Sequence, residues 1–122
     1  MYHYKIKMLR YRQYGQKGHN MIITICGSTK FKNEMLNVAS ELTLNGNIVL
    51  MPFVFAHCGD KITDRQKSLL VKLHFEKIQM SDAIYVVNIN NYIGESTRNE
   101  IKYAKKLGKI IVYLEDGTSI GH

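Results

Sequence analysis

Two carboxylates lie close together near the end of the chain, in the stretch GESTRNEIKYA at residues 94–104. Glu95 and Glu100 fall where a helix is expected to begin, and a carboxylate there can serve structure or chemistry. Thr97 and Glu100 have the spacing of a capping box, in which the glutamate satisfies a backbone N–H and complements the helix dipole. Alternatively, the carboxylate faces a crevice and reacts with a bound molecule. The residues themselves leave both interpretations open.

The loop around these carboxylates is richer in small and polar residues than a helix cap requires. It contains Asn88, Gly94 and Ser96. The apolar run AIYVVNI at 83–89 precedes it, so the loop is expected at the carboxyl end of a buried strand. These three residues are therefore candidate substrate-binding positions.

A second candidate site is the segment CGSTK, in which a strand passes directly into a helix. Gly27 permits close approach of a ligand to the backbone, Ser28 and Thr29 supply hydroxyls, and Lys30 supplies a positive charge. Free N–H groups at a helix N-terminus attract anions, so this loop could cradle a phosphate or a sugar. The alternative is an ordinary Ser/Thr helix cap. The segment is neither a Walker loop nor a complete G-x-G-x-x-G motif.

The elements that must position these residues alternate along the chain. The helices are predicted from apolar residues at helical spacing. A second capping-box pattern, formed by Thr63 and Gln66, marks the start of one of them. One of them carries a stripe formed by Leu69, Leu70, Leu73, the stem of Lys77, and Met80. Strands are predicted at 21–26, 47–55, 83–89 and 109–115, and helices within 27–46, 63–80 and 96–108.

This order predicts an α/β fold. A parallel sheet of four to five strands, joined by right-handed crossovers, should carry helices on both faces, as in a Rossmann- or flavodoxin-like three-layer α/β/α sandwich. Ligands bind such sheets at the carboxyl ends of the strands, near the point where the strand order reverses. The rule selects the loops 27–30, 52–60 and 88–100, and it adds His57 as a residue that could line the pocket or could be a plain loop histidine.

Length and composition predict one domain over residues 21–116, with a basic extension at 1–20 and a short tail at 117–122. The extension, either an upstream artefact or a real arm, contributes five of the seven net positive charges, so we do not expect the domain to bind nucleic acid. No long apolar run predicts a membrane span, so a cytoplasmic protein is expected. The chain has two cysteines. Their spacing predicts no zinc site or disulfide framework, and Cys26 is interpreted as a small buried hydrophobic residue.

Four segments together resemble one enzyme family. ITICGSTKF, NIVLMP, HFEKIQMSDAIYVVN and GESTRNEIKYAKKLGKIIVYL, which span about residues 22–115, are similar in order and spacing to the nucleoside 2-deoxyribosyltransferase superfamily. The similarity is strongest to a compact bacterial and phage-type branch, and the superfamily includes 2′-deoxynucleoside 5′-monophosphate N-glycosidases. The resemblance implies an enzyme that cleaves an N-glycosidic bond without a metal or another cofactor, and that assembles as a homodimer or higher oligomer.

The resemblance also implies roles for single residues. Glu100 matches the family's nucleophilic glutamate, and Glu95 does not. His74 occupies the position of a second acid, where it could protonate the leaving base, bind the sugar or pack as a neutral residue. Gly94 stands where the transferases carry an aspartate, a departure that favours hydrolysis over base transfer. The loop 27–30 would contact the nucleotide, with Ser96 as a further hydroxyl.

The same departures support a different class of function. With His74 and Gly94 at positions where acids are expected, the domain could bind a nucleotide or a nucleotide-derived signal without turning it over. Base release that depends on Glu100 distinguishes the enzyme from such a sensor.

Overall fold

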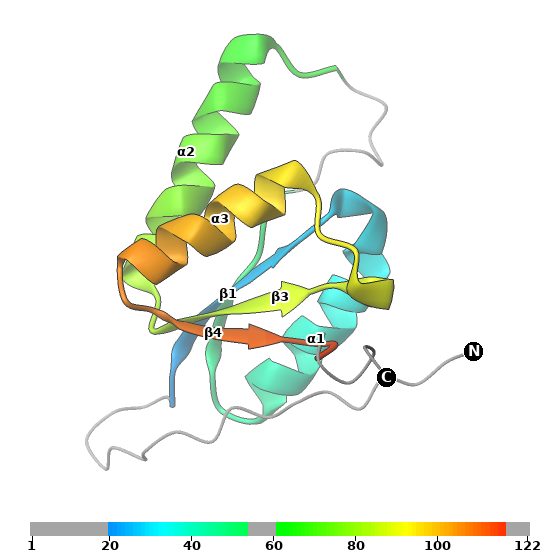
Figure 1. Cartoon of the computed structure of the whole chain (residues 1–122), viewed down its shortest axis with the longest axis vertical. Helices are drawn as coiled ribbons and strands as arrows, with labels where there is room; N and C mark the ends of the chain where they lie inside the picture. The colour runs from blue at the N-terminus through cyan, green and yellow to red at the C-terminus, as the bar shows by residue number, and fades with distance from the viewer. Residues whose placement is uncertain (1–19, 54–60, 117–122) are drawn as a thin grey trace.

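The computed structural model describes residues 20–53 and 61–116, which form the α/β sandwich expected from the sequence (Figure 1). Over these residues the chain forms alternating strands and helices with two short 3-10 turns. In order, the elements are β1 (Ile22–Gly27), η1 (Thr29–Phe31), α1 (Lys32–Leu44), β2 (Ile48–Leu50), α2 (Asp64–Met80), β3 (Ala83–Val87), η3 (Ile89–Asn91), α3 (Glu95–Lys106) and β4 (Ile110–Tyr113).

The four described strands form one sheet in the order β2-β1-β3-β4, and every pairing is parallel. The order reverses next to β1, because the chain moves from β1 to β2 on one side and then returns across β1 to β3. Helices α2 and α3 lie together on one face of the sheet, and α1 lies on the other (Figure 1). The carboxyl ends of β1 and β3 therefore mark the switch point at which a ligand site is expected.

Side-chain alternation along the strands builds a separate core on each face. Ile23 and Ile25 of β1 pack with α1 residues such as Met35, whereas Cys26 points to the opposite face and packs with Ile78 of α2. The central strands are buried on both faces, which explains why β1 and β3 read as nearly continuous apolar runs.

Helix α2 presents a different face to the core than its apolar stripe predicts. The buried residues are His74 and Ile78, which lie one helical turn apart. Leu69, Leu73 and Met80 keep 53%, 44% and 65% of their surface exposed. The helix carries apolar side chains on two adjoining faces, and the sheet can cover only one of them. Leu73 and Met80 instead line a groove together with Phe53 and the half-buried Leu70.

Two further boundaries differ from the sequence prediction. Strand β2 ends at Leu50, so the predicted strand 47–55 is too long over the described residues 51–53. Helix α3 begins at Glu95 behind an extended Gly94, whose carbonyl accepts a hydrogen bond from the backbone N–H of Arg98 at 2.9 Å. The capping-box interpretation of Thr97 and Glu100 is therefore wrong, because both residues lie inside the helix and Thr97 is buried against the core.

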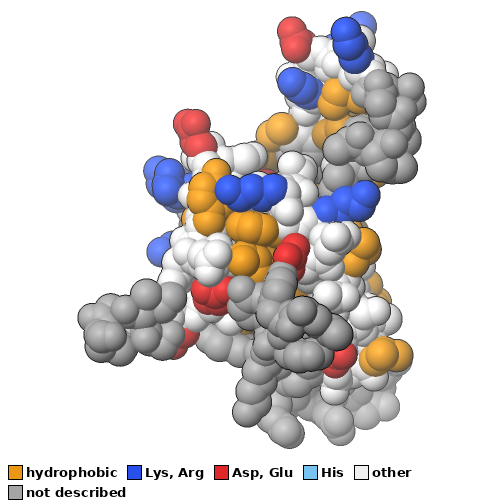
Figure 2. Space-filling view, turned by 90° about the vertical axis from the view of Figure 1, so that its right-hand side faces the viewer, with side chains coloured by type: hydrophobic (Ala, Val, Ile, Leu, Met, Phe, Trp, Pro, Cys, Tyr) orange, Lys and Arg blue, Asp and Glu red, His pale blue; other side chains and the backbone are white. Residues whose placement is uncertain are grey.

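On the face seen in Figure 2, hydrophobic side chains lie among Lys and Arg side chains and do not gather in one large patch. The helices within residues 20–53 and 61–116 are too short or too polar to span a lipid bilayer.

Candidate functional site

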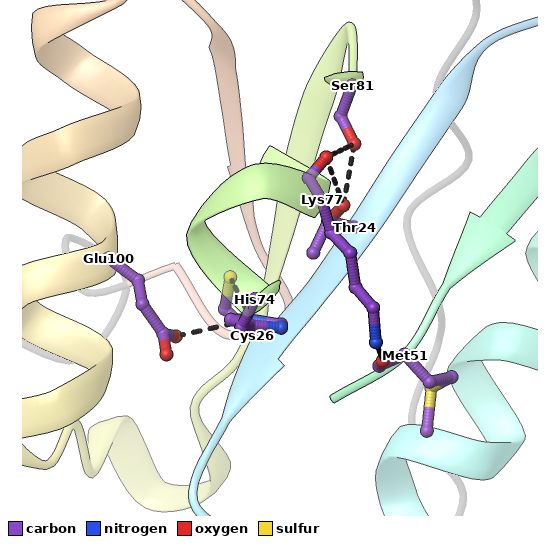
Figure 3. Close-up of polar contacts among 7 residues, drawn as sticks. All are labelled: Thr24, Cys26, Met51, His74, Lys77, Ser81 and Glu100. Carbon is purple, nitrogen blue, oxygen red and sulfur yellow. Dashed lines mark hydrogen bonds and ion pairs between the residues drawn. The ribbon is translucent and has the colours of Figure 1, made fainter. Parts of the chain in front are cut away.

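Three reactive side chains from three different elements meet at the carboxyl end of β1. Cys26 comes from β1, His74 from α2 and Glu100 from α3 (Figure 3). The His74 Nε2 atom lies 3.6 Å from Glu100 Oε1 and 3.7 Å from Cys26 Sγ. These residues lie beside the β1–β3 switch point, where folds of this kind commonly bind ligands.

Hydrogen bonds at both ends of α2 fix the position of His74. At the N-terminus, Thr63 and Gln66 form the predicted capping box, with hydrogen bonds of 3.0 and 2.9 Å. Near the C-terminus, Lys77 Nζ donates to the Met51 carbonyl at 2.7 Å. The Ser81 hydroxyl donates to the Lys77 carbonyl at 2.7 Å and contacts the Thr24 hydroxyl at 2.6 Å. The helix is thereby tied to both β1 and the end of β2 (Figure 3).

Burial of α3 places Glu100 at the margin of the core. Ile101 and Ala104 of the same helix pack among the residues beneath α2 and α3. The Glu100 side chain is 16% exposed, so its carboxyl group is largely removed from water while a path to solvent remains.

Burial also sets the ionisation of the three groups. It raises the pKa of Glu100 to about 7, and a hydrogen-bonding interaction with Cys26 partly opposes this rise. Burial lowers the pKa of His74 to about 4, and the charge of Lys77 lowers this pKa further. The pKa of Cys26 is raised by burial and then by the nearby Glu100. Near pH 7 the histidine is therefore neutral, the cysteine is a thiol and the glutamate is close to its midpoint.

His74 and Glu100 are consequently not an ordinary ion pair. A neutral imidazole carries no charge to attract a carboxylate, and 3.6 Å is longer than a normal hydrogen bond. The Nδ1 atom of His74 is buried and has no hydrogen-bond partner among the described residues. A neutral histidine of this kind can orient a neighbouring carboxylate through an Nε2–H group after a small movement.

The first candidate loop lies at the same edge of the sheet, but several of its groups already have structural partners. The Ser28 hydroxyl accepts a hydrogen bond from the Lys30 N–H at 3.3 Å and so caps η1. The Lys30 ammonium lies 3.5 Å from the centre of the Tyr92 ring, while Thr29 is exposed.

Gly27 is required by packing between protein segments. A Cβ atom at this position would lie 3.1 Å from the Val87 carbonyl oxygen and 3.3 Å from the Met35 sulfur. The sequence suggested that Gly27 allows a ligand to approach the backbone. In the structure, it is β3 and α1 that approach this residue closely.

Several polar residues in the loop after β3 have structural roles. The Asn88 side-chain amide links the end of β3 to the end of β4. Its Nδ2 atom donates to the Glu115 carbonyl and its Oδ1 atom accepts from the Glu115 N–H, both at 2.9 Å. Asn90 and Asn91 adopt left-handed conformations, with φ of 54° and 62°, which asparagine tolerates better than most residues.

The remaining candidates lie near the start of α3 or outside the described residues. Gly94 is the N-cap residue of α3, and Ser96 is exposed in its first turn. His57 lies outside the described residues. The structure thus brings Glu100 and His74 together, whereas Asn88 is engaged with Glu115.

The sequence interpretation missed the positions of Cys26 and Tyr92. Cys26 is buried as expected, but it also contacts His74. The alternation of Ile23 and Ile25 with Thr24 and Cys26 was the available signal, because it places the thiol on the face opposite the isoleucines. Tyr92 joins the two candidate loops through Lys30 and through an edge-to-face contact with Phe31 at 5.9 Å.

A scan against protein-family profiles finds no match for this sequence, and no curated protein is significantly similar to it. The functional assignment therefore rests on the resemblance of the motifs and on the geometry of the site.

Proposed function

We propose that the protein cleaves the N-glycosidic bond of a nucleoside or nucleotide, with Glu100 as nucleophile. The observation that carries this proposal is the largely buried Glu100 carboxyl group, 3.6 Å from the His74 imidazole at the carboxyl end of β1. Hydrolysis is favoured over transfer to a second base because Gly94 replaces the aspartate typical of the transferases that the sequence resembles.

In this reaction the ionised Glu100 attacks the anomeric carbon of the sugar. The bond to the base breaks as positive charge develops on the sugar, and the base leaves with the bonding electrons and takes up a proton from solvent. A glycosyl ester on Glu100 remains, and water hydrolyses it, which regenerates the carboxylate and releases the sugar with its hydroxyl group. The buried position favours attack, because a partly desolvated carboxylate is poorly stabilised by water.

His74 is better suited to positioning Glu100 than to protonating the base. Its pKa of about 4 leaves very little imidazolium near pH 7. A neutral ring can donate its Nε2–H to Oε1 of Glu100 and hold the second carboxylate oxygen toward the sugar. The buried residues Cys26 and Ile78 belong to the core on this face of the sheet, and packing there restricts the orientation of the imidazole.

A nucleoside 5′-monophosphate is the favoured substrate. Thr29 and Lys30 are both exposed at the edge where β1 ends, and they offer a hydroxyl and a charge to a phosphate. Lys30 must then exchange part of its contact with Tyr92 for the phosphate, which would couple substrate binding to the loop after β3.

We further infer a homo-oligomer. The groove beside Leu70, Leu73 and Met80 leaves apolar surface on α2 that a second copy of the chain could cover.

The test is base release from ribo- and deoxyribonucleosides and their 5′-monophosphates, separated by chromatography, with and without an acceptor base. The proposal predicts release from at least one deoxynucleoside monophosphate without an acceptor. A requirement for the acceptor would indicate transfer. Nucleotide binding with no release from any substrate would instead favour the sensor interpretation.

A further inference from the structure

The side chains around Glu100 also have the composition of a metal site. One nitrogen, one sulfur and one carboxylate oxygen, from His74, Cys26 and Glu100, all lie within 4.8 Å of one another. They come from α2, β1 and α3, which are far apart in the sequence, so ligand spacing along the chain could not reveal them.

The spacing of these donor atoms is close to that of a tetrahedral zinc site. Zinc lies about 2.0–2.1 Å from histidine nitrogen, about 2.3 Å from cysteine sulfur and about 2.0–2.2 Å from carboxylate oxygen, so neighbouring donors are about 3.3–3.6 Å apart. The two contacts of His74 Nε2, at 3.6 and 3.7 Å, are near this range. A small movement of the partly exposed Glu100 side chain would bring the third donor closer.

Direct hydrogen bonding accounts for only part of the cluster, namely the contacts of Cys26 with His74 and with Glu100. The His74–Glu100 separation of 3.6 Å exceeds the usual 2.7–3.2 Å of an N–H···O hydrogen bond. A cation at the centre would interact with all three donors at once. One thiolate and one carboxylate would also balance two positive charges, so a buried divalent ion would carry little net charge.

We propose that Cys26, His74 and Glu100 bind one divalent ion of the zinc type. Thiolate and imidazole ligands favour zinc over magnesium or calcium, which prefer oxygen ligands. Binding forms bonds from Sγ, Nε2 and a carboxylate oxygen to the ion, and any proton carried by the thiol or the carboxyl group passes to solvent. Solvent supplies the fourth ligand from the side where Glu100 is exposed.

The ion is expected to exchange and not to act as a permanent structural centre. Histidine ligands usually donate their second ring N–H to a neighbour, and loss of that partner typically costs about 10–100-fold in metal affinity. His74 Nδ1 has no such partner among the described residues. If Glu100 is the nucleophile proposed above, a bound ion occupies the attacking carboxylate, and zinc inhibits base release reversibly.

Cobalt is the most informative probe because a tetrahedral Co²⁺ site with a thiolate ligand has characteristic visible and charge-transfer absorption bands. The full chain, freed of metal with a chelator that is then removed, is titrated with Co²⁺. We expect bands that saturate at one ion per chain and disappear when Zn²⁺ is added. Absence of these bands from the folded wild type would overturn the proposal.

Matched variants locate the ion. Cys26→Ser should abolish the thiolate band, whereas Cys58→Ser, which removes the other cysteine of the chain, should preserve it. Glu100→Gln should weaken binding at least about tenfold, whereas Glu95→Gln, at an exposed position of the same helix, should not change it. Circular dichroism confirms that each variant is folded. A band that survives in Cys26→Ser would overturn the assignment.

Cobalt binding needs no substrate, so it is tested separately from the proposed enzyme activity. Cobalt bands without base release would leave the metal site standing while the function fails. Base release without cobalt bands would support the proposed function and overturn the metal site. Where both are observed, Zn²⁺ should suppress base release and a chelator should restore it, and activity that is insensitive to saturating Zn²⁺ would contradict occupation of Glu100.

Discussion

Glu100 has the environment in which a carboxyl group titrates near neutral pH. Ile101 and Ala104 hold its helix against the core, and its nearest titratable neighbours, Cys26 and His74, carry little charge at pH 7. Within residues 20–53 and 61–116, the desolvation cost is therefore opposed only by the interaction with Cys26 and not by a buried positive charge. A nucleophilic carboxylate benefits from this arrangement, because it ionises in the working pH range and retains little hydration.

The raised pKa predicts a pH-dependent stability difference between the wild type and Glu100→Gln. The folded pKa of about 7 lies above the ordinary value of 4.5 in the unfolded chain. From pH 5 to pH 8 the unfolded state loses this proton first, so the free energy of unfolding of the wild type should fall by about 2–3 kcal/mol relative to the glutamine variant.

Urea denaturation of both proteins in the presence of a chelator, at several pH values, measures this difference. Glu95→Gln, which alters an exposed carboxylate earlier in the same helix, serves as the control and should follow the wild type. If the free energies of unfolding of the wild type and Glu100→Gln changed in parallel at all pH values, the burial of Glu100 would be contradicted.

At the scale of the elements, the sequence predicts the existence of strands and helices better than their ends. The capping box of α2 is confirmed by its two hydrogen bonds. The similar pattern at Thr97 and Glu100 failed because α3 begins at Glu95 and turns the Thr97 side chain into the core. The spacing of residues along the chain cannot reveal whether Thr97 caps the helix or is buried against the core. Because α3 begins at Glu95, Glu100 lies in its second turn.

The confirmed cap makes α2 testable on its own. Thr63→Ala removes the hydroxyl that accepts the Gln66 N–H, so the free energy of unfolding should fall by about 1 kcal/mol. Ser68→Ala changes an exposed hydroxyl inside the same helix and should have an effect below about 0.5 kcal/mol. Chemical denaturation measures both values, and equal effects would show that the cap contributes no special stability.

At the scale of the whole molecule, alternation of apolar runs and amphipathic segments was enough to predict the layers and the parallel sheet. The reversal of strand order beside β1 then explains why Cys26, His74 and Glu100 meet. Motif resemblance selected Glu100 and His74, but only the packing of three elements shows the thiol beside them. The role of Asn88 was likewise hidden, because its partner Glu115 is 27 residues away.

The exposed apolar face of α2 makes the oligomer prediction specific. Leu73 lines the groove on this helix and is 44% exposed, whereas Leu44 at the end of α1 is 82% exposed and is not among the residues lining that groove. In light scattering, Leu73→Glu should shift an oligomer toward monomer because a buried, unpaired charge is costly.

Leu44→Glu, the matched control, should leave the assembly unchanged. A wild type that is monomeric at high protein concentration would rule out the homo-oligomer. An assembly that tolerates Leu73→Glu would show that another surface forms the contact.

The most direct measurement compares base release by the chelator-treated wild type, Glu100→Ala and Glu95→Gln on the best deoxynucleoside 5′-monophosphate. The account predicts at least about a thousandfold loss for Glu100→Ala, as expected when a nucleophile is removed, with the variant folded and still able to bind nucleotide. Glu95→Gln should retain activity. Equal release by wild type and Glu100→Ala would contradict the central role given to Glu100.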